Sequence, residues 1–199
     1  IDKIKLKPVA LISDAGSPLI SDPGYKIVKY CVKENIFITT IPGASSIISA
    51  LQLSGLPINE FVFFGFAPKN KKKLLDFLNR ISSEQKTSIL FVSNHKIIQI
   101  LELFIKILPN RIISVCKEIT KINERVFRGS PIKVFKEISS SSKYLLGEFV
   151  IIVDREKNTK DIEKKNINIE FEKIIRSLLS KFSLTESVEI VHKISYIEK

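Results

Sequence analysis

The chain has 199 residues but no methionine, no tryptophan and only two cysteines and two histidines. No apolar run approaches the roughly 18 residues that cross a bilayer. No charged-then-apolar leader with a small-residue cleavage site is visible, so we expect a cytoplasmic protein that does not act at a membrane. Cys31 and Cys116 lie far apart and outside any metal-ligand spacing. Buried, reduced thiols and no bound metal are therefore expected.

Several catalytic and architectural signatures are also absent. The chain contains no P-loop and no Gly-x-Ser-x-Gly nucleophile elbow. No cluster of His, Cys and Asp has the spacing of metal ligands. Internal repeats and heptads are missing too. These absences argue against a P-loop enzyme, an α/β-hydrolase, a metalloenzyme and a repeat protein.

The residues that are present indicate a globular protein with a basic surface. Hydrophobic residues make up 44% and charged residues 27% of the chain. The length allows one or two domains with a real core. The formal net charge of +11 favours polyanions, above all nucleic acid. The chain is also rich in Ile, Lys, Asn and Ser, as AT-rich genomes tend to produce, so charge alone is a modest argument for RNA.

The most informative stretch runs from Ile12 to Gly24. The apolar run Val9–Ile12 before it predicts a buried parallel strand. Polar side chains and Gly16 follow at the strand's carboxyl end, where open α/β sheets bind ligands. Asp22 is expected to cap a helix from Pro23 to about Glu34. The same residue types also fit a simple strand-to-helix connection.

The string from Ser13 to Tyr25 resembles the Ser-Asp-Ala-Gly-Thr/Ser-Pro-Leu-Ile-x-Asp-Pro-Gly-Tyr signature of a bacterial family. Its members are ribosomal RNA small subunit methyltransferases of the tetrapyrrole (corrin/porphyrin) methylase superfamily. They methylate the ribose 2′-oxygen of a cytidine, and the superfamily's corresponding loop cradles S-adenosylmethionine. The residues that the resemblance assigns to the cofactor here are Ser13, Asp14, Ala15, Gly16, Ser17, Pro18, Ile20, Ser21 and Asp22.

A second loop resembles the family's Pro-Gly-Pro-Ser/Cys-Ala motif, although Ala44 replaces the second proline. A predicted strand, 36–41, precedes it, and an apolar helical pattern follows it through Leu53, with stop signals at Gly55 and Pro57. A capped helix alone would explain these residues, but the resemblance favours a second cofactor segment. Its residues are Pro42, Gly43, Ser45 and Ser46.

A basic cluster follows the strand predicted at 61–64. The segment 65–69 matches the family's Gly-Phe-x-Pro-Lys/Arg motif. The expected RNA-binding residues are Lys69, Lys71, Lys72 and Lys73. They could clamp a phosphate backbone or could equally form a solvated helix start.

Two further strand ends carry the candidate catalytic residues. Predicted strand 88–93 leads to His95, where the family has Ser-Pro-His-Arg, and Val92 stands in place of the family's Glu. Predicted strand 111–116 leads into residues 117–121, which match Arg-Glu-Leu-Thr-Lys. The candidate proton acceptors are Glu118, Lys121 and His95. Lys121 would need a lowered pKa for that role, and would otherwise steer phosphate.

The resemblance implies an α/β fold of the tetrapyrrole-methylase kind, with two α/β domains, a cofactor cleft between them and a helical tail. The predicted segments are the second half of a Rossmann-like domain (1–57), a second α/β domain (60–154), a charged linker (155–169) and a helical segment (170–199). Strands at 124–128 and 147–153 and a helix from Ser130–Pro131 complete the second domain.

The expected function is S-adenosylmethionine-dependent 2′-O-methylation of a cytidine in 16S rRNA of the small ribosomal subunit, by a homodimer. The alternatives are a sister methylase acting on a tetrapyrrole or diphthine intermediate, and a non-catalytic basic RNA-binding remnant. The family's upstream Thr-Pro-Ile-Gly-Asn and Glu-Asp-Thr-Arg motifs do not occur here. We therefore expect a fragment truncated at both ends, which could be inactive alone.

Overall fold

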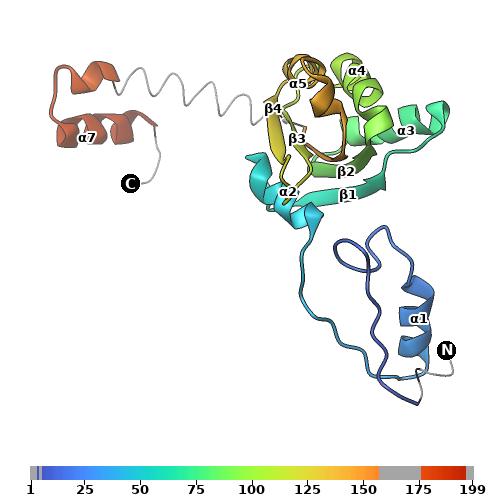
Figure 1. The fold of residues 1–199 in the computed structure, drawn as a ribbon. Helices are drawn as coiled ribbons and strands as arrows, with labels where there is room; N and C mark the ends of the chain where they lie inside the picture. Colours follow the sequence, from blue (N-terminus) through green and yellow to red (C-terminus); the bar gives the residue numbers. More distant parts are fainter. Residues whose placement is uncertain (1–3, 5, 157–175, 196–199) are drawn as a thin grey trace. The chain divides into compact units, whose positions relative to one another are not determined.

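The computed structural model describes residues 4, 6–156 and 176–195. The chain divides into two units, 1–156 and 157–199. The first contains a mixed sheet of five strands in the order β1-β2-β5-β3-β4 (Figure 1). The strands are β1 (Phe61–Phe66), β2 (Thr87–Ser93), β3 (Ile113–Lys117), β4 (Arg125–Gly129) and β5 (Glu148–Val153). The helices of this unit are α1 (Tyr25–Lys33), α2 (Ser46–Ser54), α3 (Lys71–Ser82), α4 (Ile97–Ile107) and α5 (Pro131–Ser139).

Strand β5, the last in sequence among the described residues, occupies the middle of the sheet. It pairs antiparallel with β2 and β3, whereas β1 and β2 are parallel. Its side chains alternate between two cores, with Ile151 and Val153 on one face and Val150 and Ile152 on the other. This period of two, with both faces buried, explains why the apolar run 149–153 forms a central strand.

Helices cover both faces of the sheet. Helices α3, α4 and α5 lie on one face, and α2 lies on the other (Figure 1). In α4 the buried side chains Ile97, Ile100, Leu101 and Phe104 recur at helical spacing and form one apolar stripe. The α/β class, the predicted strands of the second domain and the helix beginning at Pro131 are confirmed.

Helix α2 belongs with this sheet, although the sequence grouped it with segment 1–57. Its buried Ile47, Ala50 and Leu51 pack on the core that includes residues of β2, β3 and β5. Gly55, in the left-handed conformation, ends the helix as predicted. The Arg128 guanidinium, from β4, donates hydrogen bonds to the carbonyls of Leu53 and Ser54. A cation at the helix's carboxyl end is favourable because the end carries partial negative charge.

The strands expected at 9–12 and 36–41 are wrong, because residues 6–45 contain helix α1 and no strand. A strand satisfies its backbone by pairing with a neighbour, and neither run pairs with a strand in the described part of the chain. Their apolar side chains are exposed instead, Ile12 at 85% and Phe37 at 88%. An apolar run therefore predicts a strand only where a partner strand is available.

The predicted cap of α1 is also wrong. The helix begins at Tyr25 with Gly24 at the cap position and no side-chain cap. The Asp22 carboxylate accepts a hydrogen bond from the Ser13 hydroxyl. Asp22 is thus used to hold its own loop and is not available to cap the helix.

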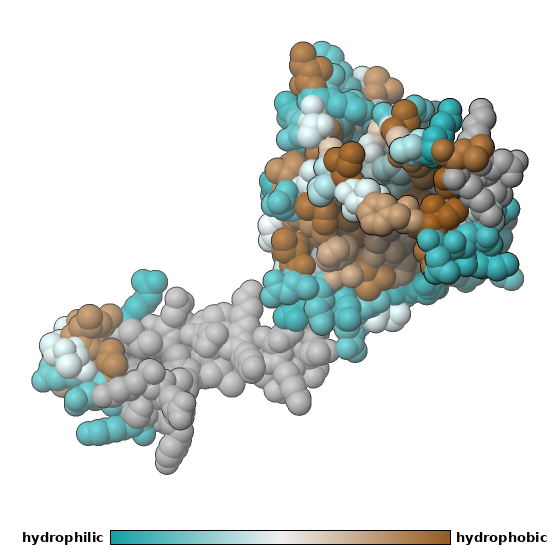
Figure 2. Space-filling model, turned by 90° about the horizontal axis from the view of Figure 1, so that it is seen from below, coloured by the Kyte–Doolittle hydropathy of each residue, from teal (hydrophilic) through white to brown (hydrophobic). Residues whose placement is uncertain are grey.

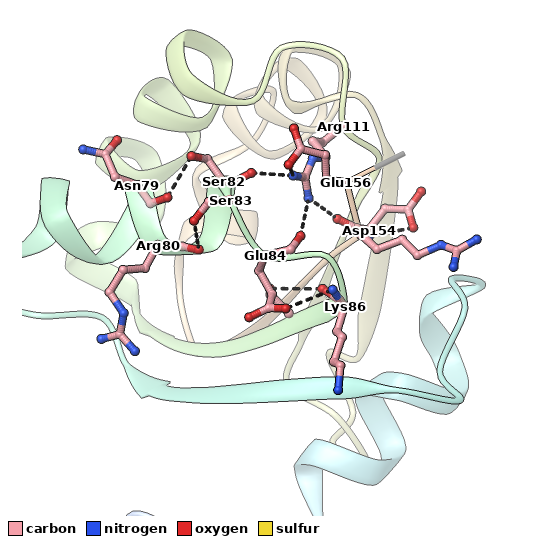
Figure 3. A network of polar contacts seen from close by, with 11 residues as sticks. Asn79, Arg80, Ser82, Ser83, Glu84, Lys86, Arg111, Asp154 and Glu156 are labelled. Atoms are coloured by element: carbon pink, nitrogen blue, oxygen red, sulfur yellow. Dashed lines mark hydrogen bonds and ion pairs between the residues drawn. The ribbon is translucent and has the colours of Figure 1, made fainter. Parts of the chain in front are cut away.

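Arg111 connects three chain segments by hydrogen bonds. It lies at one end of the sheet, and the loops that follow β1, β2 and β3 lie at the other end. Arg111 Nη1 donates to the carbonyl oxygen of Asp154 at 2.7 Å, and Nη2 donates to that of Ser82 at 2.5 Å (Figure 3). Nη1 also lies 3.5 Å from the Glu84 carbonyl, and Nη2 lies 3.8 Å from the Glu156 carboxylate. The end of α3, the turn before β2 and the end of β5 are joined by this side chain.

In the second unit the structure describes residues 176–195, including helix α7 (Leu184–Ser195). The Ser183 backbone N–H and hydroxyl donate to the Glu186 carboxylate, and the Glu186 N–H lies near the Ser183 hydroxyl. This reciprocal pair is a capping box. The helix predicted at 185–198 is confirmed as far as the structure describes it. The predicted linker lies outside the described residues from 157 onward.

Candidate functional site

A pocket of about 640 Å³ is formed at the edge of the sheet where β1 and β2 end and β5 begins. Small-molecule sites commonly have volumes of roughly 300–1,000 Å³. Figure 2 shows a hollow on one face of the molecule with apolar side chains gathered around it. The pocket is lined by Ala15, Gly16, Ser17, Ile20, Ser21, Asp22, Ser45, Ser46, Ile47, Phe66, Phe91, Val92, Ser93, Asn94, Ile119, Gly147, Glu148, Phe149 and Val150.

The loop from Ser13 to Asp22 is held by its own polar groups. Besides the Ser13–Asp22 hydrogen bond, the Ser17 hydroxyl donates to the Ala44 carbonyl at 3.3 Å, which joins this loop to the second one. Gly16 has a φ of 73°, and Ser21 adopts a φ of 63° although it carries a side chain. Such conformations persist where surrounding contacts impose them, often at binding sites.

The pocket brings together the two loops that the motifs single out. Of the predicted cofactor residues, those that line it are Ala15, Gly16, Ser17, Ile20, Ser21, Asp22, Ser45 and Ser46. The predicted residues that are not part of its lining are Ser13, Asp14, Pro18, Pro42 and Gly43. Ser13 acts indirectly, through its hydrogen bond to Asp22.

Two of the predicted catalytic residues, Glu118 and Lys121, form an ion-pair network with Glu148 beside the pocket. The Glu118 carboxylate accepts the Glu148 backbone N–H at 2.9 Å and lies 3.0 Å from Lys121 Nζ. Lys121 Nζ also lies 3.0 Å from the Glu148 carboxylate. Neither Glu118 nor Lys121 lines the pocket; Ile119 and Glu148 do.

These contacts favour the charged forms of both Glu118 and Lys121. The carboxylates of Glu148 and Glu118 raise the pKa of Lys121, which favours its ammonium form, and a role for Lys121 as proton acceptor stays a prediction. The Glu148 N–H and then Lys121 lower the pKa of Glu118, which remains a carboxylate. The pair is suited to fixing the chain at Gly147–Glu148, because a bound carboxylate and ammonium hold each other in place.

His95 is exposed and is not part of the pocket lining, although Ser93 and Asn94 are. It lies in a short 3-10 helix, Asn94–Lys96, that follows β2. Its backbone N–H donates to the Asn94 side chain at 2.8 Å. Lys96 Nζ donates to the Pro68 carbonyl at 2.6 Å and so connects this turn with the loop after β1.

Glu118→Gln should reduce stability in a pH-dependent way. The amide keeps the size of the side chain but loses the ion pair with Lys121. We expect a fall of about 0.5–1.5 kcal/mol in the free energy of unfolding near neutral pH. Because the native pKa of Glu118 is lowered, its contribution is present above the unfolded pKa of about 4.3 and is lost as the pH falls through the native value. Urea denaturation of both proteins across this range measures the difference.

The matched control for Glu118→Gln is Glu137→Gln, which removes a surface i,i+4 pair with Lys133 at 3.8 Å. That change should have a smaller effect, since exposed pairs contribute little. A Glu118→Gln effect that stays constant as the carboxyl groups are protonated would contradict the assignment.

Among the described residues, no group of His, Cys, Asp and Glu side chains is arranged to hold a metal ion. None of the helices described has the length and apolar character of a membrane span.

A family model described as tetrapyrrole (corrin/porphyrin) methylases matches residues 2–131. The chain belongs to the tetrapyrrole methylase family. Among curated proteins it is similar to ribosomal RNA small subunit methyltransferase I of Buchnera aphidicola subsp. Schizaphis graminum, with 39% identity over 98% of this chain and 68% of that protein. The protein of the same name from Hydrogenobaculum sp. (strain Y04AAS1) is 38% identical over 76% of this chain and 65% of its own length.

The protein of that name from Halalkalibacterium halodurans is 39% identical over 77% of this chain and 52% of its own length. The chain thus spans between about half and two thirds of these relatives. The resemblance read from the motifs is confirmed by these matches. Among solved structures, the methyltransferase CobJ matches 70% of this chain and 62% of its own, with 14% identity and a TM-score of 0.47.

Proposed function

We propose that this chain is part of an S-adenosylmethionine-dependent methyltransferase that methylates the ribose 2′-oxygen of a cytidine in 16S rRNA of the small ribosomal subunit. The observation that carries the proposal is the pocket, because both motif loops contribute to its lining. The relatives named ribosomal RNA small subunit methyltransferase I supply the expected substrate.

The pocket residues fit this cofactor. Phe91 offers aromatic surface for an adenine ring, and the carboxylates of Asp22 and Glu148 complement the positive charges of the amino-acid part and the sulfonium. Hydroxyls of Ser17, Ser45 and Ser46 can hydrogen-bond the polar groups of the nucleoside. When bound, the cofactor supplies an electrophilic methyl group.

The protein's own task is to align the ribose hydroxyl with that methyl group and to exclude water. A group must also accept the hydroxyl proton, at least late in the reaction. Asp22 and Glu148 are the carboxylates in the pocket lining, and so are placed for that role. Glu118 and Lys121 would hold Glu148 in position.

The RNA, the assembly and the location complete the proposal. Lys69, Lys71, Lys72 and Lys73 are exposed, and their ammonium groups have no ion-pair partner in the part of the chain that the structure describes. They support binding of 16S rRNA phosphates.

Exposed apolar side chains within residues 6–45, such as Phe37 and Ile41, support a homodimer. Cytoplasmic location follows from a ribosomal substrate.

The test is calorimetric titration with S-adenosylmethionine, followed by a transfer assay on small ribosomal subunits with methyl-labelled cofactor. Asp22→Ala should weaken cofactor binding at least about tenfold, the expected cost of losing a charged hydrogen-bonding group. Asp14→Ala is the matched control, because Asp14 is absent from the pocket lining. Absence of binding to the unaltered chain, or equal losses in the two variants, would overturn the cofactor assignment. Binding without methyl transfer to the subunits would overturn the substrate.

A further inference from the structure

An aromatic ring stands exposed at the rim of the pocket. Phe66 ends the edge strand β1 and is 60% exposed. The pairing of β1 with β2 breaks between Phe63 and Phe66, where Gly65 takes a φ of 73°. The ladder resumes when the Ala67 N–H donates to the Phe91 carbonyl at 3.0 Å. A bulge of this kind changes the direction of the next side chain, and bulges are common beside active sites.

The ring is supported from one side. Its centroid lies 5.1 Å from that of Phe91, with 59° between the ring planes. Both rings line the pocket. An exposed aromatic ring loses hydrophobic stabilisation relative to a buried one, so a backbone irregularity that directs Phe66 toward solvent indicates a use for it.

Positive charge follows Phe66 directly along the chain. Lys69 is three residues away, and the first turn of α3 begins with Lys71, Lys72 and Lys73. The loop between them is fixed by Lys96, which donates to the Pro68 carbonyl, and by Asn70, whose side chain accepts the Lys73 N–H at 3.1 Å. The Phe66 ring and the lysine ammonium groups are therefore carried by one continuous segment, from the end of β1 to the first turn of α3.

An exposed ring next to a row of cations is the arrangement that binds single-stranded nucleic acid. Bases stack on the ring whatever their identity, and the cations neutralise the adjacent phosphates. A double helix would offer the ring no free base face. The positive charge complements RNA and opposes basic partners.

We propose that Phe66 is a stacking platform for one base of single-stranded RNA at the mouth of the pocket, with Lys69, Lys71 and Lys72 binding the neighbouring phosphates. This inference rests on the proposed function for the choice of RNA as the partner. It gives Phe66 the role of seating a nucleotide next to the methylated one.

The experiment measures fluorescence anisotropy of a labelled single-stranded RNA with the full chain, without cofactor, over a range of salt concentrations. Phe66→Ala should weaken binding about 5- to 150-fold, the range for one base stacked on an aromatic side chain. The dependence of affinity on salt should stay unchanged, because no phosphate contact is lost. Lys71→Ala with Lys72→Ala should instead flatten the salt dependence, by roughly one unit of slope per contact.

Phe61→Ala is the matched control. Phe61 begins the same strand, is 39% exposed and does not line the pocket. Its removal should leave RNA affinity unchanged. Thermal unfolding of each variant separates local effects from lost folding.

Three results would overturn the inference: no RNA binding by the unaltered chain, equal affinities of Phe66→Ala and the unaltered chain, or a Phe66→Ala loss confined to S-adenosylmethionine binding. The last would make the ring a wall of the cofactor site. Failure of the proposed function is distinguishable, because it is judged by cofactor titration and methyl transfer and not by RNA affinity.

Discussion

Gly147→Ala should remove both stability and ligand affinity. Gly147 has a φ of 108°, and an added Cβ would lie 2.6 Å from Glu118 Cγ and 2.7 Å from its Cδ. Glu118 cannot move freely, because its carboxylate holds the Glu148 N–H and Lys121. Backbone strain and overpacking each cost about 1–3 kcal/mol, so the free energy of unfolding should fall by about 2–6 kcal/mol.

The same change should displace the pocket wall formed by Gly147 and Glu148. We expect cofactor affinity to fall more than about tenfold, since a displacement near 1 Å is costly in a binding site. Urea denaturation and calorimetric titration measure the two effects. Gly43→Ala is the control, because a Cβ at that glycine would contact nothing within 4 Å. A Gly147→Ala protein that matches Gly43→Ala in both measurements would contradict the described packing.

Arg111→Ala should be the most destabilising polar substitution in this fold. The side chain is 11% exposed and donates to the carbonyls of Ser82 and Asp154 (Figure 3). Its removal leaves those carbonyls without their charged donor. Breaking a buried charged contact costs about 3–5 kcal/mol, and we expect about 3 kcal/mol here because the network is partly open to water.

Arg111→Lys separates charge from geometry. Lysine keeps the positive charge but lacks the fork that reaches several carbonyls at once. About half of the loss should remain. Chemical denaturation measures both variants. Arg80→Ala serves as an exposed control, since the Arg80 guanidinium lies over the Phe64 ring and Arg80 enters the network of Figure 3 through its backbone carbonyl, which the substitution keeps. Equal stabilities of Arg111→Lys and Arg111→Ala would assign the whole effect to geometry, and no loss in either would refute the network's role.

Strands β1, β2 and β5 follow from local sequence, because each contains an apolar run with turn or polar residues on both sides. The run 61–64 and the run 88–93 form strands β1 and β2 within a residue or two of the predicted bounds. The run 36–41 has the same local character but forms no strand, since its burial depends on a neighbour strand. The local sequence pattern predicts that a segment can form a strand, and a neighbouring strand with which it can pair determines whether it does.

The pocket could be predicted only in part, for a similar reason. Ser45 and Gly16 are predicted because the family resemblance assigns both motif loops to the cofactor. Glu148 reaches the pocket because β5 runs antiparallel between β2 and β3, and no short-range signal states that order. Phe66 depends on a bulge at Gly65, which a sequence pattern of alternating apolar residues does not reveal.

The place of β5 also means that the five-stranded sheet is incomplete until residues 148–153 are in place. Before residues 148–153 join, β1–β2 and β3–β4 are two separate pairs, and a two-stranded pair is marginal in water. Each exposes the edge that β5 later fills, so both remain open to incorrect pairing while the chain is being made. Closing the long loop between β2 and β5 costs chain entropy, which slows the search. Strand β5 thus joins a parallel pair and an antiparallel pair into a single five-stranded sheet.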